Sequence, residues 1–178
     1  MGEYAAVAIS GAISTRDALS LVAFRARLMA EGSKRGRTGM LACNLSVSEI
    51  DSLLKSAIGI RASLEVACVN GPTELVISGS VEDPKWLAER LERDGRRYKR
   101  LDVSLGFHSA ALDPILEVLR QFCANINLSK PKFPIGSCHY SRQIKFQYLT
   151  PEYFVKQARG AVQFLLNFAG VIAGRSRA

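Results

Sequence analysis

Residues 64–78 have the sequence LEVACVNGPTELVIS, which consists of two short apolar runs joined by a turn. The runs 64–70 and 74–78 are rich in the β-branched and aliphatic residues that suit strands. Gly71 and Pro72 lie between them, and such a pair favours a turn because proline fixes its own backbone angle and glycine accepts conformations closed to other residues. We therefore predict two adjacent strands here.

The elements predicted on either side of this pair extend it to a larger unit. A strand is expected over 39–44, and Ser46 with Glu49 then forms a capping box that begins a helix. Beyond the pair, a second helix is expected over 83–95 and a fourth strand over 98–103. The resulting order, β-α-β-β-α-β, is that of a ferredoxin-like unit.

A helix predicted before this unit brings an arginine onto an apolar face. Ser14 begins a capping box, and helical periodicity continues as far as Glu31. Arg25 falls within the apolar stripe of this helix, whereas Arg27 falls on the polar side. Burial of a guanidinium without an anion is costly. Two partners remain open: a structural carboxylate such as that of Glu3, or the carboxylate of a bound ligand held by a two-pronged contact.

The residues after the unit predict further α/β structure and a candidate histidine. We expect a helix over 113–125, a strand over 144–149 and a last helix over about 150–169 that Gly160 interrupts. His108 lies in the loop before the first of these elements, where a rigid scaffold can present an imidazole to a cleft. The other interpretation is an ordinary loop histidine that forms a hydrogen bond with a backbone carbonyl.

Composition excludes several classes of protein. The 178 residues are 48% hydrophobic and 22% charged, which is typical of a globular domain, and 24 Lys and Arg against 16 Asp and Glu give a net charge of +8. That charge favours phosphate-bearing or acidic partners. Four scattered cysteines and two histidines do not suit a zinc site, so we expect reduced thiols, no metal and a cytoplasmic setting. The apolar run 160–174 is shorter than the roughly 20 residues of a membrane span, so we expect a buried helix there and neither export nor a membrane.

Five segments resemble, in the same order, segments of a known family. The resemblance is to malonyl-CoA:acyl-carrier-protein transacylases and to the acyltransferase domains of polyketide and fatty acid synthases, and it is strongest toward fungal iterative polyketide synthases. It covers nearly the whole chain. The segments are MGEY at 1–4, LVAFRARLM at 21–29, NGPTELVISG at 70–79, GFHSAALDPI at 106–115 and PEYFVKQARGAVQF at 151–164.

The resemblance implies a fold and two principal site residues. Residues 1–37 and 107–178 would form part of an α/β-hydrolase-like acyltransferase core, and 38–106 would form an inserted ferredoxin-like subdomain. His108 would be the general base, and Arg25 would hold the carboxylate of a malonyl unit.

The resemblance also implies the substrates and partners. Asn70 would lie beside the substrate pocket, and Phe107 would favour malonyl over bulkier branched units. The acyl donor would be malonyl-CoA or another CoA thioester, and the acceptor would be the phosphopantetheine of an acyl carrier protein, with no bound cofactor. The expected partners are that carrier protein or other domains of a synthase.

One departure from the family motif bears on activity. In Gly-His-Ser-x-Gly-Glu-Tyr, the motif that 1–4 resembles, the nucleophilic serine would stand one residue before Met1. We therefore expect an acyltransferase fragment of a polyketide or fatty acid synthase that is inactive alone. The alternative is a non-catalytic remnant that binds a carrier protein. A nucleic-acid module is disfavoured, because the strands lack the paired surface aromatic residues that stack on bases.

Overall fold

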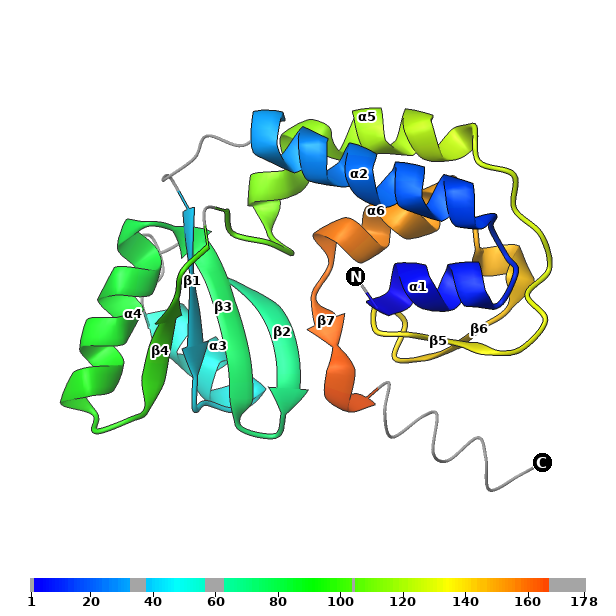
Figure 1. Cartoon of the computed structure of the whole chain (residues 1–178). Coiled ribbons are helices and arrows are strands. Elements are labelled where there is room, and N and C mark those ends of the chain that lie inside the picture. The colour runs from blue at the N-terminus through cyan, green and yellow to red at the C-terminus, as the bar shows by residue number, and fades with distance from the viewer. Residues whose placement is uncertain (1, 33–37, 57–62, 104, 167–178) are drawn as a thin grey trace, which may run out of the picture.

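The computed structural model describes residues 2–32, 38–56, 63–103 and 105–166. These residues form two groups of elements that lie next to each other (Figure 1). One group is a β-sheet with two helices, and the other is built mainly of helices.

The sheet group contains the elements predicted from the sequence, in the predicted order. Its first four strands lie in the spatial order β4-β1-β3-β2, and each neighbouring pair among them is antiparallel. The two helices of this group are α3 and α4, and the capping box predicted before α3 is present, because the backbone N–H of Ser46 donates to Glu49 Oε2 at 2.7 Å. The elements are β1 (Thr38–Cys43), α3 (Val47–Ser56), β2 (Glu65–Gly71), β3 (Glu74–Ser80), α4 (Glu82–Arg93) and β4 (Tyr98–Leu101).

A fifth strand joins this sheet from late in the chain. The strand β7 (Val162–Gln163) pairs in parallel with β2, so that Cys68 lies opposite Val162 and Val69 lies opposite Gln163. Figure 1 shows β7 leaving the helical group beside β2. The two groups are therefore joined by backbone pairing as well as by side-chain contacts.

Alternating side chains give the sheet two apolar faces. On one face, Leu41 and Ile77 are fully buried against helix residues such as Leu87. On the opposite face, Met40 and Val76 form a second, smaller cluster. Because both faces pack against other elements, β3 is buried at Leu75–Gly79 instead of alternating between buried and exposed residues. The second face contributes to the site described below.

The helical group has its own core. Val7, Leu21 and Leu119 are fully buried there, and they pack with Tyr4 and Phe154. The helices predicted over 14–31 and 113–125 are both present. The elements are α1 (Gly2–Ile9), α2 (Thr15–Gly32), α5 (Asp113–Ala124), α6 (Pro151–Arg159), the hairpin strands β5 (Ile135–Ser137) and β6 (Arg142–Ile144), and two short 3₁₀ helices, η1 (Ala110–Leu112) and η2 (Phe146–Tyr148).

The strand predicted over 144–149 is wrong. Only Ile144 belongs to a strand, and its ladder ends opposite Ile135 because β5 is three residues long. The chain then turns, and the N–H of Tyr148 donates to the carbonyl of Lys145 at 2.9 Å. The alternation of apolar and polar residues is typical of a strand, but no further partner strand is present to continue the ladder among the described residues.

The last predicted helix is also shorter than expected. It ends at Arg159, because Gly160 takes an extended backbone conformation and the next residues enter β7. The expectation of a buried helix over 160–174 is wrong for its described part, since Phe164 and Leu166 are 52% and 53% exposed. Its remaining residues lie outside the described part of the chain. Among the described residues, no helix is both long and apolar enough to cross a membrane.

Candidate functional site

A cavity of about 380 Å³ lies between α2 and the second face of the sheet. Three of the four site residues predicted from the sequence, Arg25, Phe107 and His108, line this cavity. The remaining lining side chains are apolar, apart from one thiol. They come from α2, from the strands and from the loop after β4, and they are Val22, Ala26, Met29, Met40, Cys68, Val76, Leu101 and Val103.

Arg25 is a buried cation whose hydrogen bonds are incomplete. Arg25 is only 7% exposed, as its position in the apolar stripe of α2 predicts. Nη1 donates to the hydroxyl of Tyr4 at 3.1 Å and to Oε1 of Gln157 at 3.4 Å. The guanidinium also lies over the Tyr4 ring, 5.3 Å from its centre. The Nε atom is buried without a hydrogen-bond partner in the described structure.

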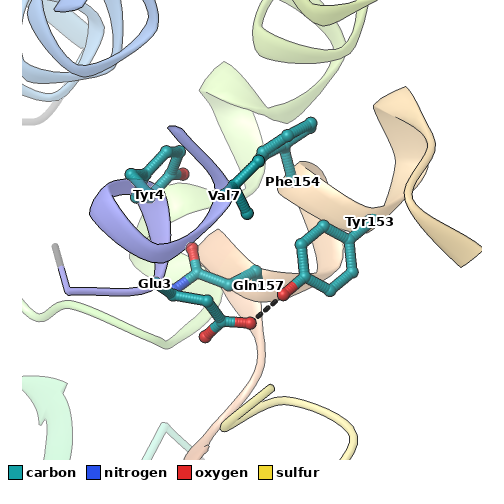
Figure 2. A pocket seen from close by; sticks show the side chains of 6 residues that line it. All are labelled: Glu3, Tyr4, Val7, Tyr153, Phe154 and Gln157. Atoms are coloured by element: carbon teal, nitrogen blue, oxygen red, sulfur yellow. Dashed lines mark hydrogen bonds between the residues drawn. The ribbon is translucent and has the colours of Figure 1, made fainter. Parts of the chain in front are cut away.

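The neighbouring carboxylate of Glu3 is engaged elsewhere. Figure 2 shows Glu3 directed at Tyr153, whose hydroxyl donates a hydrogen bond to the Glu3 carboxylate. Burial raises the pKa of Glu3, which weakens it further as a counterion. Within the described part of the chain, no carboxylate forms an ion pair with Arg25. Of the two partners left open by the sequence, the salt bridge with Glu3 is therefore absent, and the described partners of Arg25 are the hydroxyl of Tyr4 and the amide oxygen of Gln157.

His108 is held as a neutral imidazole. Burial is the main cause that lowers its pKa from 6.5 to about 4, and the positive charge of Arg25 lowers it further. Its Nδ1 lies 2.9 Å from the carbonyl oxygen of Gly160. Because a carbonyl can only accept, Nδ1 carries the proton and Nε2 keeps a free lone pair. The carbonyl contact of an ordinary loop histidine is thus present, and it is also the contact that prepares a histidine to act as a base.

The structure separates Asn70 from the other predicted site residues. Phe107 lines the cavity beside His108. Asn70 is exposed near the end of β2 and lines a different hollow, together with Asn44 and Tyr98. Among the described residues, no three His, Cys, Asp or Glu side chains gather as a metal site would require.

Sequence reasoning missed several residues that complete the site. Tyr4 and Gln157 hold the Arg25 guanidinium, and Gly160 supplies the carbonyl for His108. A signal for Gln157 was present, since it is a polar residue on the same helical face as Tyr153 and Phe154, which are buried. A Cβ added at Gly160 would lie 2.8 Å from Nδ1 of His139, so a larger residue there would require His139 to move.

The sequence is similar to parts of much longer proteins. A model of the acyl transferase domain family matches residues 1–174. The orsellinic acid synthase of Beauveria bassiana is 40% identical over 168 residues, which cover 92% of this chain and 8% of that protein. A non-reducing polyketide synthase of Cladonia grayi is 36% identical over 165 residues, again 92% of this chain and 8% of that protein. The chain therefore spans 8% of the length of these curated relatives.

Solved structures of similar shape are also longer than this chain. The acyltransferase domain from module 8 of the salinomycin polyketide synthase superposes with a TM-score of 0.87 at 28% identity, over 97% of this chain and 40% of that one. A malonyl CoA-acyl carrier protein transacylase from Clostridium perfringens superposes with a TM-score of 0.90 at 26% identity, over 97% of this chain and 55% of that one.

Proposed function

The chain belongs to the acyl transferase domain family, and from that premise we propose that it is the part of a malonyl-type polyketide synthase acyltransferase domain that binds the acyl carboxylate and supplies the general base. The observation that carries the proposal is a single cavity lined both by a buried guanidinium with an unpaired Nε and by a neutral histidine. A dicarboxylic acyl thioester matches both groups, because it carries an anion beside a reactive carbonyl.

Arg25 would fix one end of the acyl unit. Arg25 lines a cavity whose other walls are mostly apolar, and its buried Nε has no hydrogen-bond partner in the described structure, so a carboxylate bound beside the guanidinium would be poorly hydrated and strongly attracted. An acyl group that ends in a methyl group would leave the guanidinium unpaired. The preference for an acyl group with a carboxylate should therefore be large, because a buried guanidinium that is left without an anion raises the free energy of the complex. Phe107 would limit the space beside the carboxylate and so favour malonyl over branched units.

His108 would move the proton. With Nδ1–H bonded to Gly160, Nε2 can take a proton from an attacking hydroxyl and later return it to the leaving thiol. In the enzymes that the chain resembles, a serine supplies that hydroxyl, first accepting the acyl group from CoA and then passing it to a phosphopantetheine thiol. Among the described residues, the side chains that line the cavity include no serine or threonine. We therefore propose that a polypeptide of these 178 residues alone binds the acyl unit but does not transfer it.

Cys68 also lines the cavity and is the remaining nucleophile to consider. Burial raises the pKa of its thiol, so at neutral pH the sulfur stays protonated. A protonated thiol is a poor nucleophile toward a thioester. We assign Cys68 a packing role.

We also propose how the two groups of elements correspond to subdomains. The strand order β4-β1-β3-β2, with α3 and α4 packed on one face, supports a ferredoxin-like subdomain over 38–106. A hydrolase-like core would contain residues 1–37 and 107–178. The strand β7 lies within the second of these ranges, but it pairs with β2 of the ferredoxin-like sheet.

A carrier protein is the partner that the charge favours. Arg97, Lys99 and Arg100 are exposed on or beside β4, which pairs with a neighbouring strand on one side only. Such a basic edge would attract the acidic surface of an acyl carrier protein. The second candidate function, a non-catalytic remnant that binds a carrier protein, rests on this same surface. It predicts salt-sensitive binding of the carrier without any binding of malonate.

Calorimetric titration with malonyl-CoA tests the proposed function. We expect saturable binding to the wild-type chain and at least about a 30-fold loss of affinity in Arg25→Met, since a charged hydrogen-bonded contact is worth about 2 kcal/mol or more. Arg27→Met is the matched control, because Arg27 lies on the same helix with a 63% exposed side chain, and it should bind as the wild type does. Equal affinities for the two variants would remove Arg25 from the site.

A further inference from the structure

The backbone at His108 adopts an uncommon conformation that its surroundings must hold. Its φ is +55°, in the left-handed region that residues with a side chain rarely occupy. Such a residue persists only where several contacts determine its position. On the N-terminal side, the N–H of Gly106 donates to Oγ1 of Thr38 at 2.8 Å, and Oγ of Ser109 donates to the carbonyl of Gly106 at 2.7 Å.

On the C-terminal side, the loop is held by a carboxylate from the sheet. The N–H of Ala110, two residues after His108, donates to Oε1 of Glu65 at 2.7 Å. Glu65 is the first residue of β2, so the rigid sheet fixes the position of its backbone. The loop of the histidine is therefore tied to the sheet on both sides, through Thr38 and through Glu65.

The same carboxylate also holds the residue next to the hydrogen-bond acceptor of His108. Arg159 Nη1 binds Oε2 of Glu65 at 2.7 Å, and Nη2 binds Oε1 at 3.3 Å. Arg159 ends α6, and the carbonyl that accepts from His108 belongs to the next residue, Gly160. Glu65 thus binds the chain just after the histidine and just before the carbonyl that orients it.

Asp113 provides an internal comparison. It also binds Arg159, with Oδ1 at 2.5 Å from Nε, but it makes no hydrogen bond to the 106–110 loop. Its side chain is 54% exposed, whereas those of Glu65 and Arg159 are 32% and 30% exposed. The two-pronged contact of Glu65 is therefore the more shielded and more directional of the two.

We propose that Glu65 is a positioning residue for His108: by binding the Ala110 amide and the Arg159 guanidinium together, it sets the orientation of the imidazole and keeps the proton on Nδ1. The functional meaning of this role rests on the part proposed above for His108. The orientation itself can be measured without acyl transfer, so the two proposals can fail independently.

The test is nitrogen NMR of the full chain labelled at histidine, on the wild type and on Glu65→Ala, Glu65→Gln and Asp113→Ala. Wild-type His108 should show a single tautomer with the proton on Nδ1. In Glu65→Ala the ring should become a mixture of tautomers, and its pKa should rise by about one unit as water reaches it. Glu65→Gln should have an intermediate effect, because its amide oxygen still accepts from Ala110 but its amide NH2 cannot accept from Arg159. Asp113→Ala should resemble the wild type.

The sign of the pKa change separates positioning from simple electrostatics. Removal of a nearby carboxylate would by itself lower the pKa of a histidine, whereas release of the ring into water raises it. An unchanged or lowered pKa with an unchanged tautomer in Glu65→Ala overturns the proposal, and so does an equal effect in Asp113→Ala. If Glu65→Ala lacks a cooperative melt, Arg159→Ala takes its place with the same two outcomes. If the wild-type chain does not bind malonyl-CoA but the NMR results are as expected, the proposed function is refuted and the positioning role of Glu65 stands.

Discussion

Replacement of Arg25 by methionine should stabilise the protein while it weakens ligand binding. Arg25 is only 7% exposed, with no carboxylate partner in the described structure and an unpaired Nε. Burial of an ion still costs several kcal/mol after relaxation. Against this stand two hydrogen bonds from a charged donor, one of them long at 3.4 Å, and a contact with the Tyr4 ring worth about 1 kcal/mol. Methionine fills a similar volume and adds apolar contacts.

We therefore expect Arg25→Met to raise the free energy of unfolding by about 1 kcal/mol, or the melting temperature by roughly 2–4 °C. Urea unfolding can be followed by the fluorescence of Trp86, the one tryptophan of the chain. Arg27→Met is the control and should change stability by less than about 0.5 kcal/mol. Malonate should stabilise the wild type and not Arg25→Met. A loss of 2 kcal/mol or more in Arg25→Met would refute the reasoning, because Arg25 would then be a structural residue.

Three further predictions follow from the site. The pKa of His108 is about 4 in the folded chain and near 6.5 when unfolded, so the unfolded state binds more protons between these values. The free energy of unfolding should therefore rise with pH across that window by on the order of 3 kcal/mol, and His108→Gln should show a flatter profile in urea unfolding. A Cβ added at Gly106 would collide with Oγ of Ser78, so Gly106→Ala should lower the free energy of unfolding by about 2 kcal/mol, and the double variant with Ser78→Ala should recover part of the loss. Because burial raises the pKa of the Cys68 thiol, iodoacetamide should label it slowly at neutral pH, and intact mass after incubation with malonyl-CoA should show no acyl adduct; rapid acylation of Cys68 would contradict the packing role.

Periodicity and turn chemistry were sufficient for the sheet group. The capping box before α3 and the turn at Gly71 and Pro72 are local signals, and each appears in the structure with the expected partners. The inward direction of Arg25 also followed from helical spacing, since a charged residue in an apolar stripe must be buried or break the stripe.

The elements that were missed depend on contacts distant in the sequence. The helix α1 has eight residues, too few for a periodic pattern to be distinctive. The strand β7 consists of two residues, and it exists because Val162 and Gln163 reach the edge of β2. Local propensity carries no information about such pairing.

The partners of the site residues were harder to predict than the residues themselves. The sequence indicated that Arg25 needs an anion, but a hydroxyl and an amide oxygen hold it from α1 and α6 instead. Asn70 was assigned to the site by resemblance alone, and the structure places it at a different hollow. The position of Asn70 in the sequence does not indicate whether the end of β2 reaches the cavity of Arg25 and His108 or the other hollow.

The most direct test of the account is nitrogen NMR of the arginine Nε–H groups during a titration with malonate. The Arg25 Nε–H signal should shift on malonate binding while the Arg27 signal does not, and the His108 imidazole should respond at the same malonate concentration. An Arg25 signal that stays unchanged while malonate binds elsewhere, or no binding at all, would contradict the claim that this cavity receives a carboxylate.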